Sequence, residues 1–350
     1  MKSLVLFLTI AASFALLGAT AYALPEASFR ERVKELLENR SGFFSLATFS
    51  GVGSKTISFV KFGAEAGAKG CVVVSPGRSE PALKYIEVAQ DLVRSGFSPV
   101  YAIDHRGQGF SERLLADKNK NHVEKFSDYA DDFEIFVNDI VLQDPACRGH
   151  QMSLLAHSMG GAIATVYLEN VGANSPFQKA AMSAPMLKIA YPGTRTEDSV
   201  IRETWLACHT PFGPRCDDFA PGKGPFLPGT PFRGNSFTHS EARHGLTDMI
   251  HAKWNTVQVG GPTVQWVSEA AKADKELRRE KNAARISVPL LILQAEHDSI
   301  VDNEGQNEFC SFVKSCRIEK IGGAYHEIPM ESDSLRDQAI SKFVDFFSAQ

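Results

Sequence analysis

The chain has 350 residues, of which 43% are hydrophobic and 22% charged, a composition typical of globular enzymes. Its 37 basic and 41 acidic residues give a net charge of −4, and no basic run is dense enough to indicate nucleic-acid binding. This length predicts about two domain-sized units, or one large domain that carries an insertion.

Residues 1–23 have the pattern of a secretory signal peptide. Lys2 supplies a positive start, residues 4–18 form an apolar stretch, and the Ala-Tyr-Ala run at 21–23 fits a cleavage site. The apolar stretch is shorter than the roughly 20 residues of a membrane-spanning helix, which favours cleavage over anchoring. We therefore expect cleavage after Ala23 and a mature chain that is exported, either periplasmic or secreted.

Strand and helix patterns alternate along the rest of the chain. Short runs rich in β-branched and aromatic residues predict strands at 42–49, 55–63, 71–77, 99–104, 152–156, 179–185, 289–295 and 316–322. Helical patterns occupy 81–96, 122–143 and 160–170, and one follows each of the last two strands. The alternation predicts an α/β fold with a mostly parallel eight-stranded sheet and helices on both faces.

The alternation breaks between residues 186 and 284, and we predict that 186–284 is a cap inserted into the core. This segment contains all three tryptophans and, at 211–234, a run too rich in proline and glycine for a regular element. The core is then expected in two parts, 24–185 and 285–350. The aromatic side chains of the cap would line an acyl-binding cleft or form the cap's own small core.

Export would place the six cysteines in an oxidising compartment, where disulfides form. Two pairs would each close a short loop, and the third is reasonable if two apolar strands are neighbours. The pairs are Cys208 with Cys216, Cys310 with Cys316, and Cys71 with Cys147. Six buried free thiols remain the alternative.

The run LLAHSMGGAIA at 154–164 places Ser158 in a small-x-Ser-x-small pattern, the spacing of a nucleophile elbow. Ala156 stands where glycine is more usual and adds only one methyl group. The pattern is weak by itself, but a predicted strand precedes it and a predicted helix follows, as an elbow requires. A serine nucleophile also needs a base and an acid that orients the base.

The partners of the serine follow from chain order, which in this fold is serine, acid, histidine. The loop after the penultimate strand offers Glu296, Asp298 and Asp302, and Asp298 is favoured because it lies in the turn. Of the ten histidines, His326 is the only one beyond Asp298. It follows the last strand on a glycine-containing loop, although an ordinary surface histidine is the alternative. We therefore predict that Asp298 and His326 complete a catalytic triad.

An oxyanion hole needs two backbone N–H groups directed at the developing negative charge. One is expected from Met159, the residue after the serine. The other is expected from Arg78 in the loop after the third strand, where Gly77 lets the backbone approach the substrate. Only the amides of these residues are required, so their side chains are free to vary.

Other chemistries fit the sequence poorly. HEIPM resembles a zinc-protease motif, but Met330 replaces the second histidine and Pro329 breaks the required helix. The glycines at 107–109 lack the third glycine of a dinucleotide-binding loop. His105 and Arg106 beside them are interpreted as structural. The sequence therefore predicts neither a metal ion nor an organic cofactor.

Several long stretches resemble the bacterial lysophospholipase L2 family of α/β hydrolases, relatives of the monoacylglycerol lipases. They are SPGRSEPALKY, DHRGQGFSERLLAD, FSDYADDF, LAHSMGGAI, THSEAR, GGPTVQWV, LLILQAEHDSIVDN and GAYHEI. The resemblance implies hydrolysis of the single acyl ester of a lysophospholipid to a fatty acid and a glycerophosphodiester. It implies Ser158 as nucleophile, His326 as base and Asp298 as acid, and the family's elbow commonly begins with alanine.

Three alternatives remain at this stage. A monoacylglycerol lipase or general carboxylesterase would use the same triad. An aminopeptidase would need an acidic clamp for a substrate amine, and a binding protein would have kept the fold but lost the chemistry. The partners we expect are a lysophospholipid or monoacylglycerol substrate and, transiently, a membrane surface touched by the cap, with no nucleic acid.

Overall fold

The structure is a computed structural model that describes residues 25–210 and 215–349. The predicted signal peptide, 1–23, lies outside the described residues. Within the described ranges, no helix is both long enough and apolar enough to cross a lipid bilayer.

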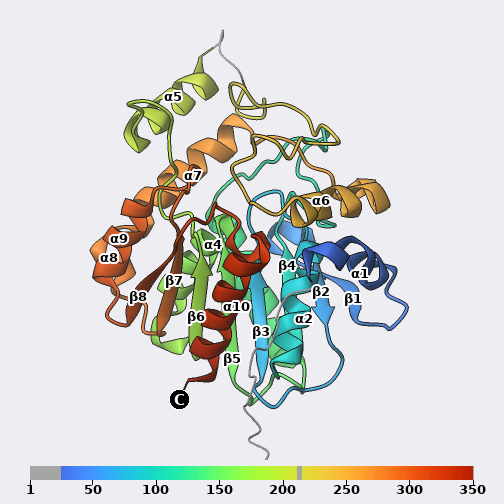
Figure 1. The fold of residues 1–350 in the computed structure, drawn as a ribbon. Helices are drawn as coiled ribbons and strands as arrows, with labels where there is room; N and C mark the ends of the chain where they lie inside the picture. Colours follow the sequence, from blue (N-terminus) through green and yellow to red (C-terminus); the bar gives the residue numbers. More distant parts are fainter. Residues whose placement is uncertain (1–24, 211–214, 350) are drawn as a thin grey trace, which may run out of the picture.

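A single eight-stranded sheet runs through the centre of the molecule (Figure 1). Its strands are β1 (Phe44–Ser50), β2 (Thr56–Phe62), β3 (Cys71–Ser75), β4 (Val100–Asp104), β5 (Met152–His157), β6 (Lys179–Ser183), β7 (Leu290–Ala295) and β8 (Cys316–Ile321). Their order is β1-β2-β4-β3-β5-β6-β7-β8; β2 is antiparallel to both neighbours and every other pair is parallel. The predicted fold class and all eight predicted strands are confirmed.

Helices cover both faces of this sheet, with α2 and α10 in front of it and α4 behind it in Figure 1. The helices are α1 (Glu26–Glu38), α2 (Ile86–Arg94), α3 (Ser127–Ile135), α4 (Met159–Val171), α5 (Glu197–His209), α6 (Glu241–Lys253), α7 (Val264–Leu277), α8 (Glu280–Ala283), α9 (Asn303–Phe312) and α10 (Asp333–Ser348). β3, β4, β5 and β7 are buried along their whole length, as expected for strands covered on both sides.

Two predicted helices differ from the structure. The segment at 81–96 begins as a 3₁₀ turn, Ala82–Tyr85, before α2. The segment at 122–143 becomes helical only at Ser127 and ends in a π-helix and a further 3₁₀ turn. Its first residues are held by the predicted cap instead, because His122 Nδ1 lies 2.9 Å from Thr263 Oγ1. Apolar periodicity identifies the buried face of such a segment, but tertiary contacts decide where the helix starts.

The predicted cap segment, 186–284, leaves the sheet after β6 and returns at β7, and it contains α5 to α8. α6 and α7 pack into the main core, since Leu246, Ile250 and Trp266 belong to the same buried cluster as the strands. α5 behaves differently, because Val200 is its only buried residue. The described part of the proline- and glycine-rich run, 215–234, has no helix or strand.

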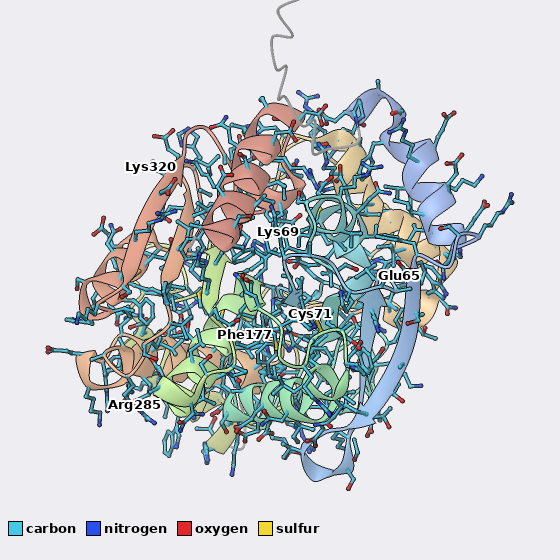
Figure 2. All side chains as sticks on the ribbon, turned by 90° about the horizontal axis from the view of Figure 1, so that it is seen from below. Glu65, Lys69, Cys71, Phe177, Arg285 and Lys320 are labelled. Carbon is cyan, nitrogen blue, oxygen red and sulfur yellow. A yellow bond between two sulfur atoms is a disulfide. The ribbon has the colours of Figure 1, made fainter. Side chains whose placement is uncertain are left out.

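Three disulfides pair all six cysteines in the combination that the sequence favoured. Cys71–Cys147 ties the start of β3 to the chain before β5, with Cα atoms 5.5 Å apart. Figure 2 shows the end of the sheet where Cys71 lies, opposite the predicted cap. The carboxyl ends of the parallel strands therefore meet at the other edge, beneath the predicted cap, where open α/β sheets place their sites.

Candidate active site

Ser158 forms a sharp turn between β5 and α4. Its backbone has φ 50° and ψ −123°, the strained conformation that exposes a nucleophile at an elbow. The turn is tightly packed, because a Cβ at Gly160 would lie 2.0 Å from the carbonyl oxygen of Ser75. A glycine at this position therefore lets the end of β3 pack directly against the start of α4.

His326 links Ser158 to Asp298 through two hydrogen bonds. Its Nε2 lies 2.9 Å from Ser158 Oγ, and its Nδ1 lies 2.7 Å from Asp298 Oδ2. The imidazole and carboxylate side chains are 4% and 0% exposed, so water competes little for these bonds. The structure thus brings together the three residues that the sequence predicted, from loops after β5, β7 and β8.

The environment of Asp298 keeps its carboxylate ionised. Burial favours the neutral acid, but the hydrogen bond with His326 and the amides of Ile300 and Val301 outweigh it, so the Asp298 pKa lies below its usual value. An ionised acid at Nδ1 leaves Nε2 of His326 free to accept a proton from the serine.

The other two acids considered for this role are occupied elsewhere. Glu296 Oε2 accepts a hydrogen bond from the Gly323 amide, 2.8 Å away. Asp302 caps the start of α9 and forms an ion pair with Lys188 at 2.6 Å. The turn position of Asp298 was therefore the informative signal.

The loop after β3 is held so that one amide is left unpaired. The Gly77 N–H donates to Glu80 Oε2 at 2.7 Å, and the Ser79 N–H donates to Gln108 Oε1 at 3.0 Å. Within the described residues, the Arg78 N–H between them has no acceptor, and neither has the Met159 N–H at the start of α4. Both predicted oxyanion donors are thus available, whereas the Gly77 amide is not.

A buried charge cluster beneath the site was not predicted from the sequence. Lys84 contacts Glu80 at 2.6 Å and Glu327, the residue after His326, at 2.7 Å. Burial alone would raise the Glu80 pKa, but the charge of Lys84 and the hydrogen bonds from Lys84 and Tyr85 lower it to about 2. Lys84 therefore ties the loop after β3 to the loop that carries His326. The Glu-x-x-x-Lys spacing of Glu80 and Lys84 was the available signal.

His157 lies against His326, with ring centroids 4.9 Å apart. Its Nδ1 lies 3.0 Å from the Ser183 carbonyl oxygen, which fixes Nδ1 as the protonated nitrogen of the neutral ring. Burial lowers the pKa of His157, so the ring stays neutral. It contributes packing beside the triad without adding positive charge.

The residues interpreted as structural, His105 and Arg106, have partners that support that interpretation. Burial lowers the His105 pKa to about 3, and its Nε2 lies 3.0 Å from Ser75 Oγ. Arg106 makes a bidentate pair with Asp132, with both distances 2.7 Å. Neither residue lines the pocket described next.

A pocket of about 570 Å³ opens above Ser158 and His326, within the range of small-molecule sites. Much of its wall is apolar and comes from the predicted cap segment and the loop after β7. These apolar residues include Ile189, Val200, Val264, Trp266, Val267 and Ile300. An acyl chain would therefore meet apolar surface within reach of the serine.

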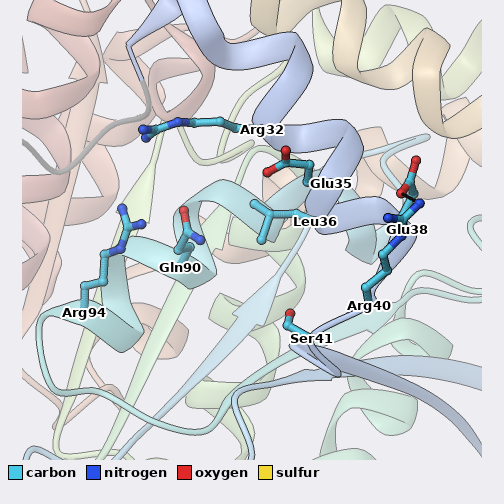
Figure 3. Close-up of a pocket in the computed structure, with 8 residues that line it drawn as sticks. All are labelled: Arg32, Glu35, Leu36, Glu38, Arg40, Ser41, Gln90 and Arg94. Atoms are coloured by element: carbon cyan, nitrogen blue, oxygen red, sulfur yellow. Dashed lines mark ion pairs between the residues drawn. The ribbon is translucent and has the colours of Figure 1, made fainter.

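A second pocket, of about 550 Å³, lies between α1 and α2, away from the triad (Figure 3). It is lined by Arg32, Glu35, Leu36, Glu38, Arg40, Ser41, Gln90 and Arg94. It contains no member of the triad. Among residues 25–210 and 215–349, no group of three or more His, Cys, Asp or Glu side chains is arranged to hold a metal ion.

The fold and this site define a serine hydrolase of the α/β-hydrolase class. Residues 66–333 match the family described as "Serine aminopeptidase, S33". Lysophospholipase L2 of Escherichia coli K12 is 38% identical over 311 residues, which cover 86% of this chain and 87% of that protein. A probable lysophospholipase L2 of Haemophilus influenzae is 31% identical, covering 82% and 86% of the two chains.

The chain therefore belongs to the lysophospholipase L2 family, within the wider S33 family. Among solved structures, a monoglyceride lipase of Saccharomyces cerevisiae in complex with a substrate analogue has the same fold. Its TM-score is 0.67 at 17% identity, covering 87% of this chain and 94% of that one. The α/β-hydrolase fold predicted from the sequence is thus confirmed.

Proposed function

We propose that this protein is an exported lysophospholipase, which hydrolyses the acyl ester of a lysophospholipid to a fatty acid and a glycerophosphodiester. The observation that carries the proposal is the continuous hydrogen-bonded chain from Ser158 through His326 to Asp298, placed beneath a largely apolar pocket. The two lysophospholipase L2 relatives support the substrate class.

The reaction would follow the acyl-enzyme route. His326 Nε2 takes the proton of Ser158 as Oγ attacks the acyl carbonyl carbon. The amides of Arg78 and Met159 donate to the oxyanion, and Asp298 orients the imidazolium. His326 then protonates the departing glycerol oxygen, and a water molecule activated by the same histidine releases the fatty acid from Ser158.

An aminopeptidase activity is less well supported by the pocket. A substrate ammonium group would need an unpaired carboxylate, but the three carboxylates of the pocket lining already have cationic partners. Glu80 and Glu327 contact Lys84, and Glu203 contacts Arg195. A neutral or anionic ester fits this lining better than an amine.

The experiment is fatty-acid release by purified residues 24–350 from lysophosphatidylcholine, a monoacylglycerol and a short p-nitrophenyl ester. We expect wild type to release fatty acid from the lysophospholipid and to be labelled by a fluorophosphonate probe. Ser158→Ala should lose both the release and the labelling. Activity confined to the neutral esters would overturn the lysophospholipase assignment and favour a monoacylglycerol lipase or carboxylesterase. Absence of labelling in folded wild type would overturn the role of Ser158 as a catalytic nucleophile.

Export is part of the proposal and rests on the leader-like residues 1–23 and on the complete pairing of the six cysteines. N-terminal sequencing of the protein recovered from the periplasm or the medium tests it. A mature chain that begins at Leu24 is expected, and an intact Met1 on cytoplasmic protein would overturn it.

The proposal also includes transient contact between the predicted cap and a membrane surface, the source of lysophospholipids. Among the described residues of the predicted cap, four large apolar side chains are exposed: Trp205, Leu206, Leu227 and Phe237. Phe237 also lines the Ser158 pocket. Cosedimentation with phospholipid vesicles should weaken in Trp205→Ser/Leu206→Ser, and equal binding by wild type and variant would overturn this contact.

A further inference from the structure

The side chain of Arg78 lines the same pocket as Ser158 and His326. Its guanidinium carbon lies 5.5 Å from the centre of the Trp266 ring, and Nη1 donates to Ser79 Oγ at 3.0 Å. The Trp266 ring is itself fixed, because its Nε1 donates to Tyr129 Oη at 3.2 Å. Among the residues that the structure describes, Ser79 Oγ is the one hydrogen-bond acceptor of this guanidinium, so most of its N–H donors are unused.

Arg78 differs from the three buried arginines, each of which pairs with a carboxylate. Arg106 pairs with Asp132, Arg243 with Glu87, and Arg336 with Asp91. Arg78 also differs from the half-buried Arg113, whose guanidinium donates to the carbonyl oxygens of Gly109, Ser111 and Thr256. Within residues 25–210 and 215–349, no carboxylate lies within ion-pair distance of Arg78, and burial lowers its pKa. A partly buried cation without a counter-charge is costly, so the site favours binding of an anion.

The carboxylates around the pocket cannot supply that anion. Glu80 and Glu327 share Lys84, and Glu203 is paired with Arg195. Lys223, which also lines the pocket, has no carboxylate partner among the described residues, but its side chain is exposed at the rim. The charged pocket residues without a partner of opposite charge are therefore both cations, and Arg78 is the less exposed of the two.

We propose that the Arg78 guanidinium binds the phosphate diester of the substrate's head group while the acyl ester lies at Ser158. This inference rests on the proposed lysophospholipase function and deepens it. A planar guanidinium can donate two parallel hydrogen bonds to phosphate oxygens, and the guanidinium of Arg78 lies over the Trp266 ring.

The position of Arg78 in the chain explains how one residue could serve both groups. Its backbone N–H is one of the two available oxyanion donors, and the residue also lines the pocket. In a lysophospholipid, only the glycerol backbone separates the ester from the phosphate. Arg78 would therefore favour phosphate-bearing esters over neutral monoacylglycerols of the same chain length.

The test measures binding separately from turnover. An ether-linked lysophosphatidylcholine, which has no ester to cleave, and the 1-alkylglycerol of equal chain length are used as inhibitors of p-nitrophenyl butyrate hydrolysis. In Arg78→Met, the inhibition constant of the phosphate compound should rise roughly ten- to a hundredfold. That of the alkylglycerol should change by less than about threefold.

Two further variants make the result specific. Arg78→Lys keeps the charge but loses the bidentate geometry, so its effect should be intermediate. Arg94→Met removes an exposed cation beside the other pocket and should alter neither inhibition constant, which controls for net charge. If a variant at Arg78 lacks esterase activity, calorimetric binding of the same two compounds to the folded protein replaces inhibition.

The outcomes separate the two proposals. Parallel changes in both inhibition constants, or none, would overturn the role of the Arg78 side chain, even if wild type hydrolyses lysophosphatidylcholine. Weaker binding of the phosphate compound, with unchanged binding of the alkylglycerol, would support that role. Failure of wild type to hydrolyse lysophosphatidylcholine would overturn the proposed function, whatever the two inhibition constants are.

Discussion

The carboxyl edge of the sheet and the α5 segment lie next to each other but are built differently. At the edge, Ser158 and His326 are buried, the side chain of Asp298 is 0% exposed, and the three are joined by hydrogen bonds. In α5, Trp205 is 56% exposed, and only Val200 is buried.

The difference shows where this molecule needs rigidity. Catalytic groups must keep a fixed geometry, which requires packed neighbours and satisfied hydrogen bonds. A segment that covers an acyl-binding pocket needs an apolar surface but little internal packing of its own. Substitutions at buried positions should therefore cost far more than matched substitutions at exposed positions of the cap segment.

The largest effect is expected for Asp298→Asn, which would leave the wrong tautomer of His326 facing Ser158. Loss of the triad acid's charge should lower kcat on the order of ten-thousandfold, with little change in stability. Fatty-acid release and thermal unfolding measure the two quantities. Asp302→Asn, whose ion pair with Lys188 is partly exposed, is the control and should retain most activity. Equal losses in both variants would contradict the assignment of the acid.

Lys84→Met tests the buried cluster that joins the two active-site loops. It would leave Glu80 and Glu327 without their shared cation, at a cost of about 3–5 kcal/mol in the free energy of unfolding. Lys275→Met removes the exposed pair with Asp198 and should cost less than about 1 kcal/mol. Denaturant unfolding of both variants gives the comparison, and similar costs would show that the cluster is not structurally important.

The same cluster should make stability depend on acid pH. The Glu80 pKa of about 2 lies below its ordinary value of 4.5, so the stabilisation is complete above pH 4.5 and is lost as pH falls toward 2. The loss should be on the order of 3 kcal/mol. Glu80→Gln should flatten this acid branch in unfolding experiments between pH 5 and about 2. A variant with the wild-type slope would assign the pH dependence to other carboxylates.

Gly160→Ala tests the close approach of α4 to β3. The added Cβ would meet the Ser75 carbonyl oxygen at 2.0 Å, so backbone must shift, at a cost of about 1–3 kcal/mol and with displacement of Ser158. Gly224→Ala in the cap segment is the matched control, because nothing lies within 4 Å of its added Cβ. Esterase activity and the free energy of unfolding should both fall in Gly160→Ala but not in Gly224→Ala. If Gly160→Ala keeps wild-type activity and stability, the close packing at the elbow is ruled out.

The smallest effect on stability is expected for Trp205→Ser, which should change the free energy of unfolding by less than about 0.5 kcal/mol. Trp266→Ser removes a tryptophan that is 4% exposed and should cost about 3–5 kcal/mol. Chemical denaturation measures both. A large cost at Trp205 would show that α5 is packed in a way that its exposure does not indicate.

Much of the fold could be predicted because its signals are local. The apolar strands are short enough to be recognised by composition, and Ser158 stands out because a strand and a helix flank it. The two short disulfide loops were expected from the spacing of their cysteines, given the predicted export. The starts of the helices at 81–96 and 122–143 were predicted less well, because neighbouring segments, such as the chain around Thr263, fix them.

The sequence by itself determined the order of strands and helices, the elbow at Ser158 and the chain order of the acid and the histidine. Only the tertiary structure decided that His326 Nε2 lies 2.9 Å from a serine 168 residues earlier in the chain. It also decided that Lys84 is shared by two carboxylates and that Arg78 has none. The physical reason is that hydrophobic periodicity acts between near neighbours, whereas the partner of a buried charge depends on which distant segments the fold brings together.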